Sequence, residues 1–177
     1  PAAVGFPRRL AGALPVERGG VGRVGRELGA LWCRRLFEAG DVEAAGEVAR
    51  VVLATEPLNE AAMDTAFNVA TRQGRPGDVE PLLEAALDVN GRSVAHLNYL
   101  AFVRESEGDL PEAERLLLDA LEVDPEHGAP LVNRGRVYAT HGRPAEAVPL
   151  LRRALDGNPG NADARRLLER IESEVSD

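Results

Sequence analysis

The side chains with the widest chemical repertoire in this 177-residue sequence are three histidines and one cysteine. His96, His127 and His141 do not share the i, i+4 spacing that sets two metal ligands on one helix face. Cys33 has no histidine near it in the sequence that would take its proton. We therefore expect histidines that are solvated or stabilise helix ends, and a cysteine that is a small, buried apolar side chain.

Other catalytic patterns are absent from the sequence as well. All 21 basic residues are arginine, which excludes a Schiff-base lysine and a phosphate-loop lysine. The glycine-rich stretch at residues 19–25 follows no predicted strand, so a linker explains it better than a phosphate-binding loop. The acidic residues are interspersed with arginine, as on a solvated helix face. The sequence thus predicts a protein that is not an enzyme, with no cofactor and no metal site.

Composition narrows the class of partner. Apolar residues make up 44% of the chain and charged residues 28%, which is typical of a folded protein. The net charge of -8 argues against direct binding of nucleic acid or an anionic membrane, because both need a basic surface. No apolar run is long enough to span a bilayer. With one cysteine the chain cannot form an internal disulfide, and we expect a cytoplasmic protein.

The elements that position these side chains can be predicted from an interval of 34 residues that recurs along the chain. Glycine recurs at Gly40, Gly74, Gly108 and Gly142. Leucine recurs with the same interval at Leu53, Leu87, Leu121 and Leu155. Small apolar residues form two further columns: Ala45, Val79, Ala113 and Ala147, then Val52, Ala86, Ala120 and Ala154. A turn-forming column comprises Pro57, Gly91, Pro125 and Pro159. Columns that keep one phase over four cycles indicate four copies of one structural unit.

Each copy is predicted to be a pair of helices. In the third cycle, apolar residues of helical period run up to Gly108, where glycine ends the first helix at little conformational cost. A second helix begins near Pro111, since proline is tolerated in the first helical turn. Small residues stand where two helices would cross closely, and leucines where they would not. Pro81 and Pro149 are predicted to lie inside second helices and to kink them modestly.

The fourth cycle has the fullest set of residues that recur in such units: Leu131, Gly135, Tyr138, Gly142, Ala147, Leu151, Ala154 and Pro159. This pattern resembles the tetratricopeptide repeat family, whose units have about 34 residues. The resemblance implies an all-α fold, a right-handed α-solenoid of helix-turn-helix repeats. Three positions depart from the family pattern. Gly29 replaces a large residue, Phe67 a small one, and Arg134 a leucine, so we expect Arg134 to thin the core or to extend to solvent.

The boundaries follow from the phase of the repeats. We expect a flexible, basic, glycine- and proline-rich arm or linker at residues 1–25. Four repeats then occupy residues 26–59, 60–93, 94–127 and 128–161. Residues 162–177 are predicted to form a capping helix, because one side is apolar and the rest is charged.

The resemblance also implies a binding site. In this family the first helices of the repeats line a concave groove that holds a peptide or a helix of a partner. The matching positions here give a candidate set: Arg34, Phe37, Asp64, Asn68, Arg72, Asn98, Phe102, Asn133 and Arg136. The asparagines would bond a peptide backbone, the arginines would bind carboxylates, and the phenylalanines would anchor an apolar side chain.

The resulting prediction is a protein-interaction module, a scaffold or adaptor. Its partner would be a protein or peptide, including one with an acidic or C-terminal tail, and a homo-oligomer is compatible with the sequence. Chaperone-tail binding is not predicted, because Ala30 stands where the family's clamp has lysine. The alternative is a regulatory segment of a larger bacterial protein, since residues 56–76 resemble helical activator domains of actinobacterial regulators.

Overall fold

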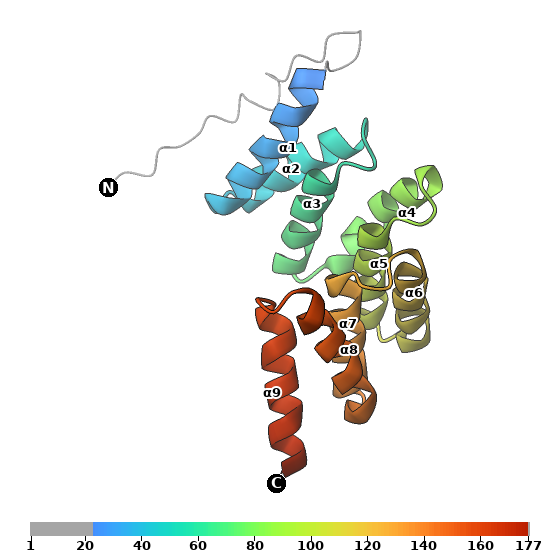
Figure 1. Ribbon diagram of the computed structural model, residues 1–177. Helices are drawn as coiled ribbons and strands as arrows, with labels where there is room; N and C mark the ends of the chain where they lie inside the picture. Colours follow the sequence, from blue (N-terminus) through green and yellow to red (C-terminus); the bar gives the residue numbers. More distant parts are fainter. Residues whose placement is uncertain (1–22, 177) are drawn as a thin grey trace, which may run out of the picture. The chain divides into compact units, whose positions relative to one another are not determined.

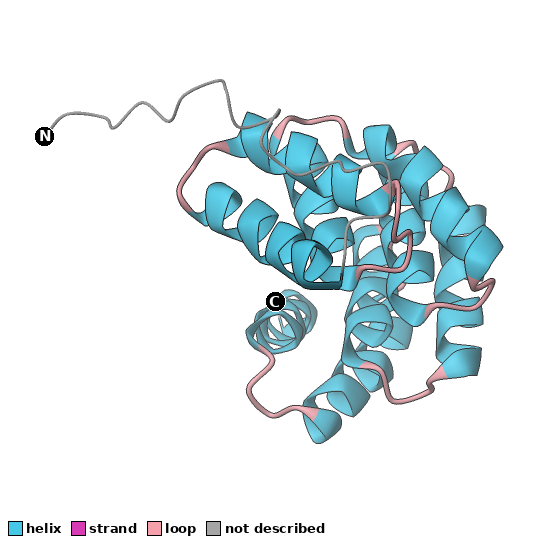
Figure 2. Cartoon of the chain, turned by 90° about the horizontal axis from the view of Figure 1, so that it is seen from above, coloured by secondary structure: helices cyan, strands magenta, loops and turns pink. Residues whose placement is uncertain are grey.

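The computed structural model describes residues 23–176, which belong to two compact units divided after Gly74. Within the described range the secondary structure consists of nine α-helices and one 3-10 turn (Figures 1 and 2). The predicted all-α class is therefore confirmed. The arm expected at residues 1–25 lies outside the described residues up to position 22, and α1 begins at Arg23, ahead of the predicted start of the repeats.

The first unit contains three helices: α1 (Arg23–Glu38), α2 (Val42–Leu53) and α3 (Glu60–Arg72). α1 packs against α2 and α3, and α2 packs against α3. Gly29 explains the close approach of α1 to α2, because a Cβ atom there would lie 2.8 Å from Cγ2 of Val52. Gly29 replaces the large residue of the family pattern because the two helices touch at this position, where only a glycine fits against Val52.

The second unit begins with a 3-10 turn, η1 (Pro76–Val79), followed by α4 (Glu80–Val89). Two helix pairs follow: α5 (Val94–Ser106) with α6 (Leu110–Val123), and α7 (Gly128–Thr140) with α8 (Pro144–Gly157). The last helix is α9 (Ala162–Ser176), which packs on α8 and α7 in the stretch predicted as the cap. The division between the units falls at Gly74, inside the stretch 60–93 that the spacing predicts as one repeat.

The glycine column acts as predicted. Gly40, Gly74, Gly108 and Gly142 have φ values of 86°, 71°, 85° and 74°, and no other described residue has a positive φ. This left-handed conformation is accessible to glycine without a Cβ clash, so each glycine ends one helix and turns the chain into the next. After Gly108, for example, the amide of Asp109 donates to the carbonyl of Arg104, and the Asp109 side chain then caps α6.

One prediction about proline is wrong. Pro81 does not lie inside a helix: the chain first forms η1 after Pro76, and α4 begins only at Glu80, so Pro81 occupies its first turn. In that place the missing amide hydrogen removes no helical bond. Pro149 does lie inside α8, as predicted.

The small-residue columns lie at the helix crossings. Ala113, Ala120, Ala147 and Ala154 are at most 1% exposed. At Gly135 a Cβ atom would meet Cδ2 of Leu151 at 2.9 Å, so α7 and α8 are in contact through backbone and leucine. Such crossings leave no volume for larger side chains, because the interior is close-packed. The right-handed sense of the array stays a prediction.

Overpacking one crossing should therefore unfold its helix pair. We expect Ala154→Trp to destabilise the protein by about 1–3 kcal/mol or more, because α7 and α8 must separate to admit the indole. Ala145→Trp is the matched control, since Ala145 lies on the same helix and is exposed. Thermal unfolding followed by circular dichroism measures the difference. Equal midpoints for the two variants would contradict the assignment of Ala154 to the crossing.

Candidate functional site

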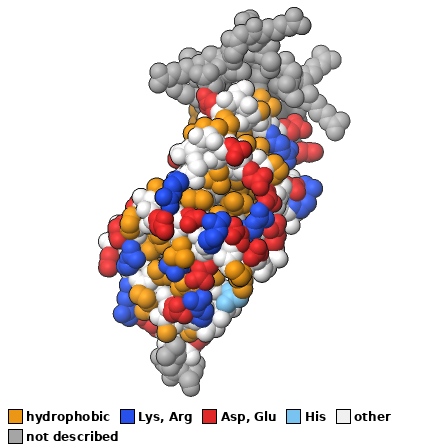
Figure 3. Space-filling model, turned by 90° about the vertical axis from the view of Figure 1, so that its right-hand side faces the viewer, with side chains coloured by type: hydrophobic (Ala, Val, Ile, Leu, Met, Phe, Trp, Pro, Cys, Tyr) orange, Lys and Arg blue, Asp and Glu red, His pale blue; other side chains and the backbone are white. Residues whose placement is uncertain are grey.

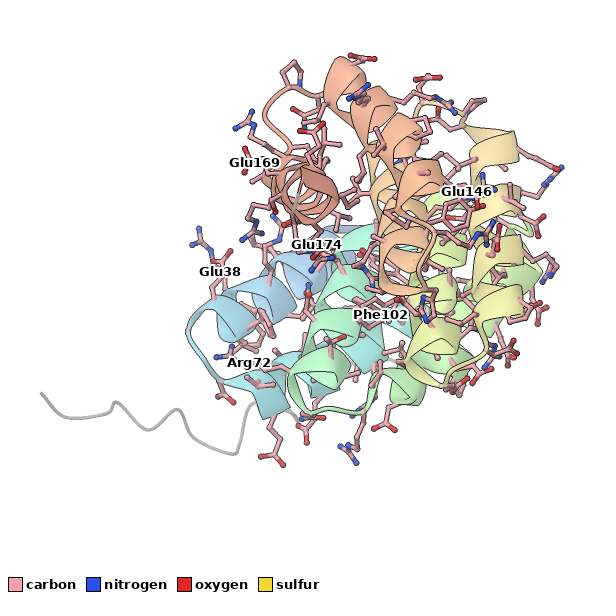
Figure 4. The ribbon with its side chains drawn as sticks, turned by 90° about the horizontal axis from the view of Figure 1, so that it is seen from below. Glu38, Arg72, Phe102, Glu146, Glu169 and Glu174 are labelled. Carbon is pink, nitrogen blue, oxygen red and sulfur yellow. The ribbon has the colours of Figure 1, made fainter. Side chains whose placement is uncertain are left out.

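In the first unit, the predicted site residues lie on α1 and α3. Arg72, which is labelled in Figure 4, places its guanidinium carbon 5.6 Å from the centre of the Phe37 ring, within the range of a cation–π contact. Arg34 precedes Phe37 by three residues, and Asn68 precedes Arg72 by four, so each pair shares one helix face. Arg34, Asn68 and Arg72 are exposed, and Phe37 is half-buried.

In the second unit, the predicted residues of α5 and α7 contact one another. The amide of Asn133 donates to the side-chain oxygen of Asn98 over 2.8 Å, and Asn98 is only 8% exposed. Arg136 lies over the Phe102 ring at 5.4 Å and donates to Glu105 over 2.6 Å. Both polar pairs join the two helices, so these residues bond to the protein itself. Asn98 is buried, whereas Phe102, Asn133 and Arg136 are half-buried.

The two units differ in how their arginines are neutralised. Arg34, Arg50 and Arg72 of the first unit form no ion pair with a described residue. In the second unit every described arginine lies within 4.0 Å of a carboxylate, apart from Arg165, which donates to the carbonyl of Pro159. The α1–α3 face, defined by Arg34, Phe37, Asn68 and Arg72, therefore carries positive charge that the described part of the fold leaves uncompensated.

A further site residue on α3, Asp64, precedes Asn68 by one helical turn and is exposed. It adds one carboxylate to the predicted site residues of the first unit, on the same helix as Arg72. The charge on this face is thus mixed, like that in Figure 3, where acidic and basic side chains alternate over one side of the molecule. Recognition at the α1–α3 face would depend on the placement of a few groups rather than on a uniform potential.

The stacking of arginine on phenylalanine occurs once in each unit. Phe102 and Arg136 stand one repeat interval apart, and Phe37 and Arg72 one position more, so each contact joins the first helices of successive repeats. The ring holds the guanidinium flat, which reduces the entropy lost when the arginine binds a ligand. In the second unit Arg136 also forms an ion pair with Glu105, whereas in the first unit Arg72 forms no ion pair with a described residue. The candidate set omitted Glu105, although its place three residues after Phe102 puts it on the same face of α5.

A polar cluster in the second unit was also missed. The Tyr138 hydroxyl donates to Oε1 of Glu114 over 2.5 Å and accepts from Nη2 of Arg134 over 2.6 Å. Arg143 lies 4.1 Å from the centre of the Tyr138 ring and donates to the other oxygen of Glu114. The cluster joins α6, α7 and the start of α8. Arg134 thus neither leaves a void nor extends freely to solvent: its guanidinium is held by tyrosine and glutamate.

Hydrogen bonding sets the protonation of this cluster. The bond from Tyr138 lowers the pKa of Glu114, with Arg143 contributing, while burial of the carboxyl acts in the opposite direction. Burial raises the pKa of Tyr138, and its bond to the Glu114 carboxylate raises it further. At neutral pH the tyrosine is protonated and the glutamate is charged, which is the state that the hydrogen bonds require.

The histidines and the cysteine have structural surroundings. His96 is 1% exposed, and its Nδ1 lies 2.5 Å from Oγ of Ser93, the residue before α5, so of the two predicted alternatives it fits a histidine at a helix end and not a solvated one. His127 and His141 flank α7 at its two ends. Cys33 is fully buried, and its thiol donates to the carbonyl of Ala30. Among the described residues no three histidine, cysteine or acidic side chains form a metal-binding group.

Comparison with known families identifies the repeats. The tetratricopeptide repeat family model matches residues 65–126 and 103–162, which together span more than half of the chain. The chain therefore belongs to the tetratricopeptide repeat family. This fold supports a protein-interaction module in general, and members of the family are typically non-catalytic scaffolds. A comparison with curated protein sequences finds no match.

Solved structures show the same fold at low sequence identity. A tetratricopeptide repeat protein from Parabacteroides merdae is 21% identical, with a TM-score of 0.59; the match covers 84% of this chain and 60% of that protein. PilF of Pseudomonas aeruginosa is 20% identical, with a TM-score of 0.70 and coverage of 85% and 69%. PilW, a type IV pilus biogenesis factor, is 19% identical, with a TM-score of 0.73 and coverage of 88% and 71%. None of the described helices is long and apolar enough to cross a membrane.

The cluster around Glu114 should make the free energy of unfolding depend on pH. Because the pKa of Glu114 is lowered from 4.5, its charged form stabilises the fold fully above pH 4.5, and this contribution is lost as the pH falls through the lowered value. We expect Glu114→Gln to lower the free energy of unfolding by about 1 kcal/mol near neutral pH, and by less in acid. Denaturant titrations at about pH 6.5 and about pH 3.5 measure both values.

Glu122→Gln is the control for this experiment. Glu122 lies on the same helix, but its side chain is 66% exposed and its partner Arg92 is 61% exposed, so its ion pair contributes little. If Glu114→Gln and Glu122→Gln show the same dependence on pH, the proposed role of the Tyr138 hydrogen bond is incorrect.

Proposed function

We propose that this protein is an adaptor that binds an acidic segment of a partner protein at the α1–α3 face. The observation that carries the proposal is the pair of exposed arginines, Arg34 and Arg72, without an ion-pair partner among the described residues. Elsewhere in the described chain, arginines at comparable positions are neutralised, as Arg136 is by Glu105. An exposed arginine that has no carboxylate partner within the described protein can bind a carboxylate of a partner protein.

The neighbouring side chains define what such a segment would contain. Arg72 would bind a carboxylate with two parallel hydrogen bonds while its other face stays on Phe37. Asn68, one turn earlier on α3, offers a donor and an acceptor and would bond a peptide group. The exposed edge of Phe37 would contact an apolar side chain. The segment therefore carries an acidic side chain or a terminal carboxylate next to an apolar residue.

The face of α5 and α7 would play a different part. Its arginine is already paired and its two asparagines are bonded to each other, so a carboxylate would have to displace Glu105. Phe102, Asn133 and Arg136 are therefore proposed to contact uncharged parts of a partner, while the buried Asn98 holds Asn133 in place. The charge specificity of the protein would then reside in the first unit.

The neighbours named above contribute the fold to this proposal and nothing more specific. The pilus role printed for PilW belongs to that protein, and 19% identity carries over the architecture alone. The alternative of a regulatory segment receives no support from the family match or from the solved structures. The buried free thiol of Cys33 is compatible with a cytoplasmic setting, which we keep as part of the proposal.

Removing both arginines should weaken binding selectively. For Arg34→Ala combined with Arg72→Ala we expect about a tenfold or greater loss of affinity for acidic peptides, because each exposed pair contributes up to about 1 kcal/mol. The probes are fluorescent synthetic peptides in three sets: acidic with an apolar neighbour, neutral with the same apolar residue, and basic. Anisotropy titrations measure each affinity, and both alanine substitutions are on the surface, so the thermal midpoint should hardly change.

Arg50→Ala is the matched control. Arg50 is an exposed arginine of the same unit, has no ion pair with a described residue, and lies on α2, away from the proposed contacts. A site-specific interaction predicts unchanged affinity for this variant. Equal losses in Arg50→Ala and in the double variant would indicate nonspecific charge attraction, and the failure of every acidic peptide to bind would refute the proposed site.

A further inference from the structure

A second surface of α1 is apolar and exposed. Leu28 is 58% exposed, Leu31 49% and Trp32 39%, and the three residues follow the i, i+3, i+4 spacing of one helix face. Arg35 continues this face by one turn. Large apolar side chains gathered in this way are unusual on the surface of a protein that has no partner. We call Leu28, Leu31 and Trp32 the α1 apolar face.

The repeat register shows what kind of position this face occupies. Most residues one and two repeat intervals further along are buried: Ala62, Thr65 and Ala66 on α3 are at most 5% exposed, His96 and Leu100 on α5 are at most 8% exposed, and Tyr99 on α5 is half-buried. On α3 this face is therefore a packing surface, and on α5 it is mostly one. On α1 the same positions hold two leucines and a tryptophan, and all three side chains are open to solvent.

Within the first unit, the corresponding face of α3 is covered by other helices. Oγ1 of Thr65 on α3 lies 3.5 Å from Sγ of Cys33 on α1, so the α3 counterpart of Leu31 lies against α1. Val69, one turn further along α3, lies 3.1 Å from the place where a Cβ of Gly46 on α2 would be. A preceding pair of helices therefore covers this face of α3, and the α1 apolar face has the shape and chemistry to accept helices in the same way.

The last helix offers a contrast. The buried side of α9 consists of Ala164, Leu167 and Ile171. Among the side chains of α9 whose burial is described, the exposed ones are polar apart from Ala162: Asp163, Arg165, Arg166, Glu169, Arg170, Glu172, Ser173 and Glu174 (Figure 4). Stacking α9 of one copy on α1 of another would bury these charges against leucine and tryptophan, at a large desolvation penalty. Head-to-tail association is therefore disfavoured, whereas contact of the α1 apolar face with the same face of a second copy buries apolar surface on both sides.

The charges around this face also permit that contact. Arg35 forms an ion pair with Glu38 at 3.5 Å, with 72% and 54% of the two side chains exposed. The rim thus contains a neutral pair, so two copies would not repel each other there. An apolar centre with a charged, solvated rim is the usual anatomy of an interface between proteins.

We propose that two copies of this chain form a closed dimer about a two-fold axis, with Leu28, Leu31 and Trp32 of one copy packed against the same residues of the other. The interface uses a different side of α1 from Arg34 and Phe37, and it goes beyond the proposed binding of an acidic segment. A two-fold contact uses identical patches and therefore stops at two chains. Because the apolar centre is small, the dimer should dissociate on dilution.

The chain contains one tryptophan, so Trp32 reports on this interface directly. Sedimentation equilibrium of the full chain between about 1 µM and about 1 mM should show the mass rise from 18.9 kDa toward twice that value. Over the same range the fluorescence of Trp32 should shift to shorter wavelength as the indole leaves water. Leu28→Glu combined with Leu31→Glu keeps the fluorophore and should raise the dissociation constant about tenfold or more.

Val89→Glu combined with Leu118→Glu is the matched control, because these apolar residues are 62% and 39% exposed on α4 and α6 and also leave Trp32 in place. It should dimerise like the parent, and circular dichroism should show the same helix content in all variants. The mass of a single chain at every concentration would overturn the proposal. A mass that grows beyond two chains, or a dimer unaffected by the two α1 substitutions, would overturn it as well.

Discussion

The close crossing of paired helices is the constraint on which the rest of this structure depends. Two helices approach closely only where the side chains between them are small, and here that requirement returns once in every repeat at alanine, glycine or valine. A glycine with positive φ then turns the chain after each first helix in the same way. Because every pair is built alike, side chains of successive first helices come into register, and this register brings Phe37 to Arg72 and Phe102 to Arg136.

The fold was predictable from single residue types, and the detail of the site was not. Periodic columns of alanine, leucine and glycine report a packing geometry that tolerates few alternatives, so helix pairs, turns and the last helix followed from them. The partners of exposed polar residues depend instead on side-chain rotamers and on neighbours about one repeat away in the sequence. Nothing in the types of Asn98 and Asn133 indicates that they bond each other, or that Glu105 reaches Arg136.

The errors have the same origin. The spacing predicts Pro81 inside a helix, because the repeat pattern does not reveal the 3-10 turn that the chain forms after Pro76. The family pattern predicts that Arg134 thins the core or extends to solvent, whereas the tyrosine four residues later offers both a ring and a hydroxyl that hold it. In each place a local contact replaced the one that the family pattern would supply. Charge behaves similarly: the second unit compensates its arginines internally, and the first leaves three without ion pairs among the described residues.

The cluster around Tyr138 has a consequence for cooperativity. In repeat proteins, stability is approximately a sum of terms for each unit and terms for the interfaces between neighbours. Glu114 belongs to one helix pair, whereas Tyr138, Arg134 and Arg143 belong to the next, so the cluster adds directly to an interface term. The larger that term is relative to the stability of each pair, the less often one pair opens while the other stays folded. A tyrosine at this crossing thus does more than fill space: it couples the melting of two neighbouring repeats.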